Sequence, residues 1–244
     1  MTVKGCVVLI TGGAVRIGRA IGVALASHGA QVAFSYRTSG REARKTLGDL
    51  QRLGSHAMAI CTDVSDARSV AALLHRVKQR YGRLDVLINN AAIFPRTPFD
   101  RLTEAQWDHV IDANLKGPFL CALAASRLMR ASGGGKIINL ADWAAVRPYR
   151  DYLPYCVSKA GVIGLTKALA KELAPTIQVN AIAPGPILAP GAMSAQQRTR
   201  IAKRTLLQRW GSPKEIANTV RFLIEGTDFM TGSVVFVDGG QLIA

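Results

Sequence analysis

The sequence predicts an α/β fold in which a parallel sheet is covered by helices on both faces. Apolar runs of strand length alternate with longer segments of helical periodicity along the chain. The first run is followed at once by a glycine-rich turn, and later runs end in short polar or small segments. At 244 residues, 49% of them hydrophobic, the chain has the size and composition of one large domain. We therefore expect residues 1–244 to form a single domain with its ligands at the carboxyl ends of the strands.

The first predicted strand, Val3 to Ile10, precedes a turn that we interpret as a pyrophosphate site. The turn occupies residues 11–18, reads TGGAVRIG, and opens a helix that runs through Leu25. Glycines let the backbone approach a phosphate closely, and a helix N-terminus presents free N–H groups. A cation in the first helical turn opposes the helix dipole unless an anion lies nearby. The candidate cofactor residues of this turn are Gly12, Arg16, Ile17 and Gly18.

The second predicted strand, Gln31 to Tyr36, ends in a segment that favours NADP over NAD. Sites that prefer NAD place an acidic residue near this point, whereas an arginine accommodates the 2′-phosphate of NADP. Arg37 follows the strand, and no acidic residue occurs before Glu42. The alternative interpretation is that Arg16 and Arg37 are solvated surface residues. The candidate cofactor residues are Tyr36, Arg37, Thr38 and Ser39.

The alternation continues through the middle of the chain. Helices are predicted over Glu42 to Leu53, Asp66 to Arg80, Glu104 to Ile111 and Leu115 to Arg130. Strands are predicted over His56 to Cys61, Leu84 to Ile88 and Lys136 to Leu140. Candidate cofactor residues after these strands are Asp63, Val64, Asn90 and Ala91. Phe94, just beyond, could stack on a flat substrate ring or serve as packing. Asn114 is a poor helix former within helical sequence and could simply face water.

The chemistry is predicted in the stretch from Asn139 to Gly161. Tyr155 and Lys159 lie four residues apart, which places them on one face of a helix. A lysine beside a tyrosine stabilises the phenolate and lowers the phenol pKa from about 10 towards working pH, which makes a usable proton donor. Asp142 follows a predicted buried strand whose end opens at the ligand crevice. Taken alone, the Tyr-x-x-x-Lys spacing is weak evidence, because Tyr and Lys four residues apart are commonly plain helix surface.

The C-terminal third contains a predicted substrate loop and helix at about residues 185–210. The helix that carries Tyr155 should run to about Ala174. It is followed by a strand at Ile177 to Ile182 and by residues 183–191, which are too rich in proline and glycine for regular structure. A loop of this length is often an active-site lid. The chain closes with a basic helix at Ala195 to Arg204, a helix at Pro213 to Ile224 and a strand at Val234 to Val237.

Composition excludes several classes of protein. The net charge of +15 fits either nucleic-acid binding or the steering of anionic small molecules into a cleft, but the basic residues are dispersed and no nucleic-acid motif accompanies them. No stretch of about eighteen apolar residues occurs, so we expect neither a signal peptide nor a membrane span. The four cysteines form no C-x-x-C pair, which favours a reduced, cytoplasmic protein. The four histidines lack ligand-like spacing, so we expect no metal.

Several ordered motifs together resemble the short-chain dehydrogenase/reductases over essentially the full length. They are T-G-x-x-x-R-x-G at 11–18, N-N-A-A at 89–92, Asn114, Y-x-x-x-K at 155–159, P-G at 184–185 and D-G-G at 238–240. The resemblance implies a Rossmann-type, doubly wound sheet of about seven parallel strands. It makes Tyr155 the proton donor, Lys159 the residue that holds the nicotinamide ribose, and Asn114 the support of a water relay. It also implies cofactor contacts at Pro184 and Gly185, and a homotetramer formed through the helices that begin near Asn114 and Pro154.

Asp142 departs from the family pattern, because most members have a serine thirteen residues before the tyrosine. A serine hydroxyl can donate a hydrogen bond to a substrate carbonyl, whereas an ionised aspartate only accepts and would repel that oxygen. With Arg16 in the glycine loop, a basic end to the second strand and Phe94, the chain is similar to the pteridine reductases. Ala92, where those enzymes often carry serine, and residues 35–39, which only approximate their cofactor motif, depart from them.

The resemblance to pteridine reductases implies that NADPH reduces a C=N bond of a pterin, with Asp142 and Tyr155 supplying protons. Dihydrobiopterin, dihydromonapterin or a dihydrofolate-like compound would be the substrate. The expected substrate residues are Arg16, Phe94, Asp142, Tyr152, Tyr155 and Leu188. Two alternatives remain: a short-chain reductase of a carbonyl or another imine, and a basic binding protein that uses its charge on nucleic acid.

Overall fold

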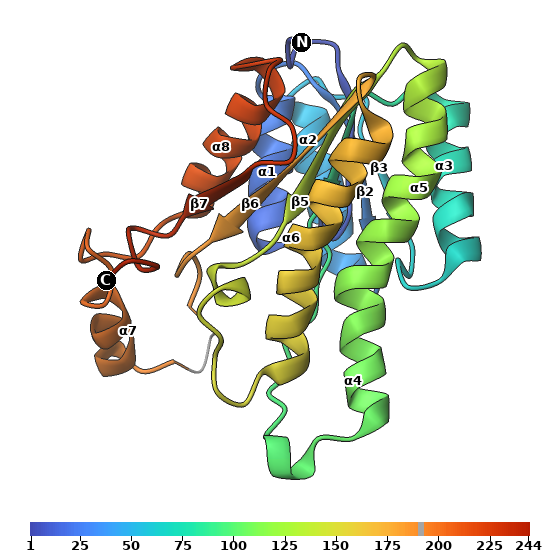
Figure 1. The fold of residues 1–244 in the computed structure, drawn as a ribbon. Coiled ribbons are helices and arrows are strands. Elements are labelled where there is room, and N and C mark those ends of the chain that lie inside the picture. Colours follow the sequence, from blue (N-terminus) through green and yellow to red (C-terminus); the bar gives the residue numbers. More distant parts are fainter. Residues whose placement is uncertain (190–192) are drawn as a thin grey trace.

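The computed structural model describes residues 1–189 and 193–244. Within these ranges, seven strands form a parallel sheet, as predicted, and their order is β3-β2-β1-β4-β5-β6-β7 (Figure 1). The strands are β1 (Val7–Ile10), β2 (Gln31–Tyr36), β3 (Met58–Cys61), β4 (Val86–Asn89), β5 (Gly135–Leu140), β6 (Ile177–Pro184) and β7 (Val234–Val237). The chain order reverses between β1 and β4, and ligands of such sheets bind beyond the carboxyl ends of the strands at this point.

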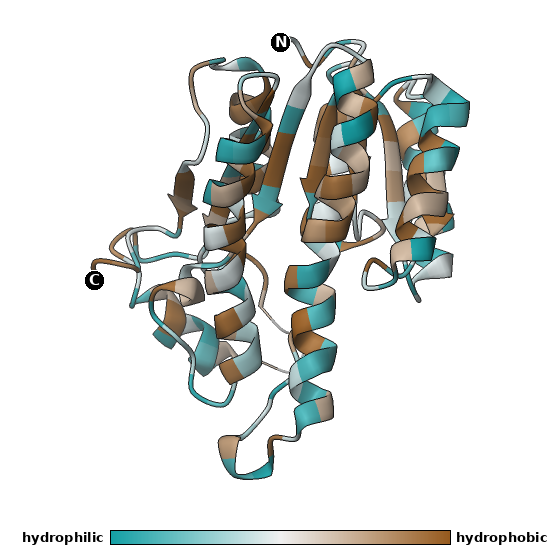
Figure 2. Cartoon of the chain, turned by 45° about the vertical axis from the view of Figure 1, so that its right-hand side comes forward, coloured by the Kyte–Doolittle hydropathy of each residue, from teal (hydrophilic) through white to brown (hydrophobic). Residues whose placement is uncertain are grey.

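Helices cover both faces of the sheet. They are α1 (Arg16–Ala26), α2 (Gly40–Arg52), α3 (Ala67–Tyr81), α4 (Glu104–Ile111), α5 (Gly117–Ala131), α6 (Leu153–Leu173), α7 (Ala195–Ala202) and α8 (Pro213–Glu225). Because side chains alternate along a strand, Val8 and Ile10 pack with α1, α2 and α8, whereas Val7 and Leu9 pack with α3, α5 and α6. Figure 2 shows the resulting apolar strands between the two helical layers. Of the described helices, none is long and apolar enough to cross a membrane.

Three local expectations are corrected by the structure. Strand β1 begins at Val7 instead of Val3, because Gly5 takes a positive φ of 81° and turns the chain. Strand β6 continues through Ala183 and Pro184, which we had expected in an irregular loop; both pair with β7. The remainder of that predicted loop lies partly outside the described residues. The helix expected from Leu115 begins at Gly117 as α5, after the π-helical turn η2 (Asp112–Lys116).

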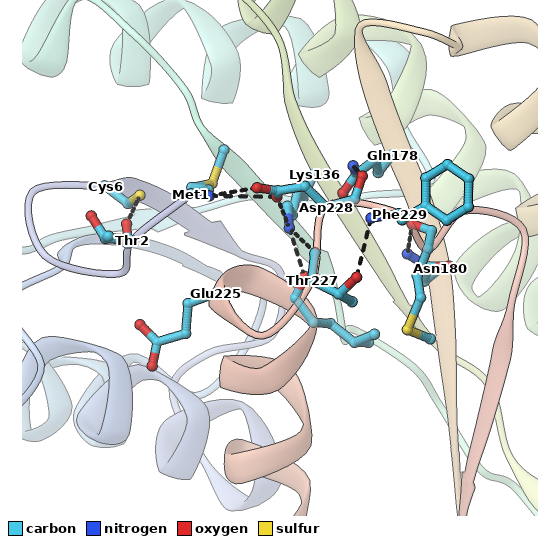
Figure 3. Close-up of polar contacts among 12 residues, drawn as sticks. Met1, Thr2, Cys6, Lys136, Gln178, Asn180, Glu225, Thr227, Asp228 and Phe229 are labelled. Atoms are coloured by element: carbon cyan, nitrogen blue, oxygen red, sulfur yellow. Dashed lines mark hydrogen bonds and ion pairs between the residues drawn. The ribbon is translucent and has the colours of Figure 1, made fainter.

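A buried lysine accounts for part of the basic charge at the end of the sheet opposite to the predicted site. Lys136, near the start of β5, has a side chain only 5% exposed, and its Nζ lies 2.8 Å from a carboxylate oxygen of Asp228. It also donates to the main-chain oxygens of Leu223 and Thr227, while the N-terminal amine of Met1 contacts the same aspartate (Figure 3). A charge that is paired and hydrogen-bonded in this way is part of the fold and is not available to a ligand.

Candidate active site

A cleft of about 990 Å³ opens at the carboxyl ends of the strands. This is the upper end of the range of roughly 300–1,000 Å³ that is usual for ligand sites. Every predicted cofactor residue lines it: Gly12, Arg16, Ile17, Gly18, Tyr36, Arg37, Thr38, Ser39, Asp63, Val64, Asn90, Ala91, Tyr155, Lys159, Pro184 and Gly185. The other predicted substrate residues, Phe94, Asp142, Tyr152 and Leu188, line it as well. Sheet order therefore brings together residues from both halves of the chain.

The glycine turn and the start of α1 form a cradle that fits a pyrophosphate. The N-cap residue Val15 makes no side-chain capping bond, and the first turn carries no acidic residue, so no side chain competes for its N–H groups. A Cβ on Gly18 would lie 2.4 Å from the carbonyl oxygen of Gly12, so only glycine permits this packing. Asn90 donates from Nδ2 to the oxygens of Thr11 and Gly12 and holds the turn in place.

Two arginines mark this half of the cleft. Arg16 is the first residue of α1 and has a positive φ of 52°; its guanidinium donates to the main-chain oxygen of Leu188, 3.2 Å away across the cleft. Arg37 follows β2, and its Nη1 lies 3.5 Å from an oxygen of Asp63. Hydrogen bonds from Ser65, with help from Arg37, hold the pKa of Asp63 below its usual value, so this carboxylate stays ionised beside the guanidinium.

Tyr155, Asp142 and Lys159 meet at the ends of β5 and α6. The Tyr155 hydroxyl donates to Oδ2 of Asp142 over 2.7 Å, and the main-chain N–H of Ala144 donates to the other carboxylate oxygen over 2.8 Å. Lys159 donates to the main-chain oxygen of Leu140 over 2.6 Å and lies 5.8 Å from the centre of the Tyr155 ring. The nearest charged partner of the phenol is therefore the carboxylate.

The pKa values follow from burial and from this carboxylate. Burial raises the pKa of Tyr155 well above 10, and the charge and hydrogen bond of Asp142 raise it further. Burial also raises the pKa of Asp142 and lowers that of Lys159 to about 8. The expectation that Lys159 brings the phenol pKa down towards working pH is wrong for this arrangement. Tyr155 and Asp142 instead act as one unit that holds a proton between them.

Asn114 does not line the cleft, unlike the other predicted catalytic residues. It is buried in the turn η2, where its Oδ1 accepts from the main-chain N–H of Ile93 over 2.8 Å and its Nδ2 donates back to the Ile93 oxygen over 2.9 Å. A weaker contact of 3.3 Å joins it to Ser158, next to Lys159. The expectation that Asn114 could face water is wrong, because its side chain stabilises the loop after β4. Its part in a water relay stays a prediction.

Aromatic rings form one wall of the cleft. Phe94 and Tyr152 stack with centroids 4.2 Å apart and planes 7° from parallel. The rings of Phe94 and Tyr155 lie edge-to-face, with centroids 4.4 Å apart and planes at 73°. Nothing fits between two rings at that spacing. The Phe94 ring is nevertheless 47% exposed, so part of it stays accessible; that it stacks on a substrate stays a prediction.

Several cleft residues were missed by the sequence analysis. They include Trp143, Arg147, Tyr149, Arg150, Arg204, Trp210 and Gln241. Four of them lie within nine residues after Asp142, and this run of aromatic and basic side chains beyond a site strand was a usable signal. Gln241 had none. Its main-chain oxygen accepts from Arg147 over 2.9 Å, and its buried Oε1 finds no hydrogen-bond partner in residues 1–189 and 193–244.

Fold and site together define an oxidoreductase that uses a nicotinamide dinucleotide. A family model described as enoyl-(acyl carrier protein) reductase matches residues 13–241. The 3-oxoacyl-[acyl-carrier-protein] reductase FabG of Staphylococcus aureus (strain Mu50) is 39% identical over 237 residues, which are 96% of each chain. The chain therefore belongs to the short-chain dehydrogenase/reductase family, as its motifs indicated.

Solved structures agree with this assignment. A short-chain dehydrogenase/reductase from Serratia marcescens matches with a TM-score of 0.93 at 30% identity and covers 99% of this chain and 100% of that one. Actinorhodin polyketide ketoreductase with NADPH matches with a TM-score of 0.92 at 32% identity, and the match covers 100% of this chain and 99% of that one. NAD⁺-bound xylitol dehydrogenase matches with a TM-score of 0.91 at 28% identity, and the match covers 98% of this chain and 100% of that one. None of these relatives is named as a pteridine reductase, so the comparisons do not show the expected resemblance to that group.

Proposed function

We propose that this chain is an NADPH-dependent reductase of a flat nitrogen heterocycle of the pterin type, reduced at a ring C=N bond. The observation that carries the proposal is the hydrogen bond between Tyr155 and Asp142 inside the cleft. It places a carboxyl and a phenol side by side, next to the half-exposed ring of Phe94. Such a pair can accept from ring N–H groups and donate to ring nitrogens, which a simple ketone does not require.

When bound, NADPH would supply the hydride. The residues of this chain would do the rest: Phe94 stacks on the ring, Lys159 contacts the nicotinamide ribose, and the Tyr155–Asp142 pair delivers one proton to the ring nitrogen. Hydride to carbon and proton to nitrogen convert C=N to CH–NH, so the pair must regain one proton per turnover. The raised pKa of Asp142 favours this, because a carboxyl that protonates nearer to neutral pH can pass on a proton.

The second candidate function is the reduction of a carbonyl, which the relatives favour over the first. The Staphylococcus aureus and actinorhodin enzymes are named for 3-oxoacyl and polyketide ketone substrates. In this chain Tyr155 would donate its proton to the developing alkoxide. Asp142 would then have to be protonated, because an ionised carboxylate beside Tyr155 repels that oxygen.

A substrate panel separates the two functions. We expect the purified protein to oxidise NADPH with dihydrobiopterin at a kcat/KM at least about tenfold above that with ketones, the discrimination of one well-placed polar contact in a buried site. Turnover of ketones without turnover of pterins would contradict the first function and leave the second.

The cofactor is proposed to be NADPH because Arg37 lies at the end of β2, where a 2′-phosphate would sit. We expect Arg37→Ala to raise the KM for NADPH by about ten- to hundredfold, the loss of one charge-assisted hydrogen bond, and that for NADH by less than about threefold. Arg76→Ala, at an exposed position in the middle of α3, is the matched control. Equal increases in the KM for NADPH and for NADH would show that Arg37 does not contact the 2′-phosphate.

We further propose a homotetramer. Its support is the exposed apolar side chains along the outer faces of α5 and α6. They are Phe119, Leu123, Leu153 and Val157, each 39–45% exposed. Burial of these faces against second copies would remove apolar surface from water.

A further inference from the structure

We propose that the substrate carries an anionic group, a carboxylate or a phosphate, remote from the reacting bond, and that Arg150 and Arg204 hold it at the mouth of the cleft. The proposal rests on the proposed function only in taking the cleft as the place where substrate is reduced. The side chains that line the cleft include six basic groups and two acidic ones, Asp63 and Asp142. Such an imbalance in a concave site attracts anions.

Four of the six basic groups already have partners or assigned tasks. Arg37 and Arg16 lie at the dinucleotide half, and Lys159 lies at the reacting centre. Arg147 donates to the main-chain oxygens of Gln241 and Ala244, at 2.9 and 2.8 Å, and so holds the C-terminal segment. Among the residues that the structure describes, Arg150 and Arg204 are the two basic groups of the cleft that have no such partner or role.

The 2′-phosphate of the dinucleotide does not explain these two arginines. Arg37 follows β2, whereas Arg150 follows the segment after β5 and Arg204 follows α7, beyond β6. Between β2 and β6 lie four strand spacings in the observed order, or roughly 19 Å at about 4.8 Å each. Arg150 follows β5, three spacings or roughly 14 Å from β2. A 2′-phosphate held by Arg37 is therefore distant from both arginines.

The carboxylates closest in sequence are already paired elsewhere. Asp151, beside Arg150, binds Arg96 at 2.7 Å, and Glu215 binds Arg209 at 2.6 Å. Over the described part of the chain, no carboxylate oxygen lies within 4.0 Å of the guanidinium of Arg150 or Arg204. Unpaired guanidinium groups that line the same cleft suit a planar carboxylate or a phosphate, which accept guanidinium N–H groups in pairs.

The test uses substrate pairs that share a reacting group and differ in charge. Dihydrobiopterin is the neutral pterin, dihydrofolate carries carboxylates and dihydroneopterin monophosphate carries a phosphate. Ethyl acetoacetate and acetoacetate form a ketone pair. We expect the wild-type enzyme to favour the anionic member, and its KM to rise with salt for that member alone. The two charged pterins show which anion the site takes.

The variants are Arg150→Gln, Arg204→Gln and the double change, with Arg76→Gln as the control. The double variant should lose about ten- to hundredfold in kcat/KM for anionic substrates, the worth of charge-assisted hydrogen bonds, while neutral substrates change by less than about twofold. An unchanged KM for NADPH verifies folding. Equal losses for neutral and anionic substrates, or no anion preference in the wild type, would overturn the proposal.

The outcomes keep this inference apart from the proposed function. Anion preference within the ketone pair alone would retain the anion site and contradict pterin reduction. Pterin turnover without any preference for the charged substrates would support pterin reduction and contradict the anion site.

Discussion

Replacing Asp142 with serine should lower kcat/KM for a pterin by about a hundredfold. The change removes a group that accepts from ring N–H donors and shares a proton with Tyr155 over 2.7 Å, and general acid–base groups contribute about 10²- to 10⁴-fold. Serine can still accept from the main-chain N–H of Ala144, so the start of the short helix η3 (Trp143–Ala145) should persist. Steady-state kinetics with dihydrobiopterin and with ketones measure the effect.

The same variant should alter the pH profile. The charge of Asp142 raises the pKa of Tyr155, so its removal should move the alkaline limb of kcat to lower pH. Asp108→Ser, at an exposed position on α4, is the matched control and should change neither property. Unchanged pterin turnover in Asp142→Ser would remove this residue from the mechanism, and a loss of ketone turnover would favour the second candidate function.

Replacing Lys159 with methionine should lower kcat by about 10²- to 10³-fold, which is the usual loss when one preorganised electrostatic contact is removed. The same change should stabilise the folded chain at pH 7 relative to the wild type. Burial lowers the pKa of this lysine from 10.5 to about 8, so its positive charge opposes folding at neutral pH. The shift corresponds to roughly 3 kcal/mol. Methionine leaves the Leu140 oxygen without its donor, which offsets part of that gain.

The sign of the pH dependence follows from proton uptake. Between about pH 8 and 10.5 the unfolded wild type binds more protons at this lysine than the folded one, so its stability rises with pH over that window. The free energy of unfolding of Lys159→Met minus that of wild type should therefore be largest near pH 7 and fall by up to roughly 3 kcal/mol towards pH 10. Denaturant titrations measure it, with Lys167→Met, exposed on the same helix, as control. Parallel curves would contradict the lowered pKa.

Local sequence was sufficient for most of the scaffold. Alternating apolar runs located every strand and helix to within a few residues, and β2, α4 and β7 match their expected bounds. Errors occurred where a single residue overrode periodicity. Gly5 turned the chain before β1, and pairing with β7 kept Pro184 in a strand. The Tyr155–Lys159 spacing and the glycine turn were also readable, because each is set by one helix or one loop.

By itself, then, the sequence determined the α/β class, the dinucleotide cradle and the identity of the reacting side chains, since these depend on residues close together in the chain. Only the tertiary structure decided which partner each side chain meets. It paired Tyr155 with Asp142 and directed Lys159 to the Leu140 oxygen, it buried Asn114 behind Ile93, and it brought Arg150 and Arg204 into the same cleft. Sheet order and burial set those distances and the pKa values that depend on them, and neither is encoded in the spacing of residues along the chain.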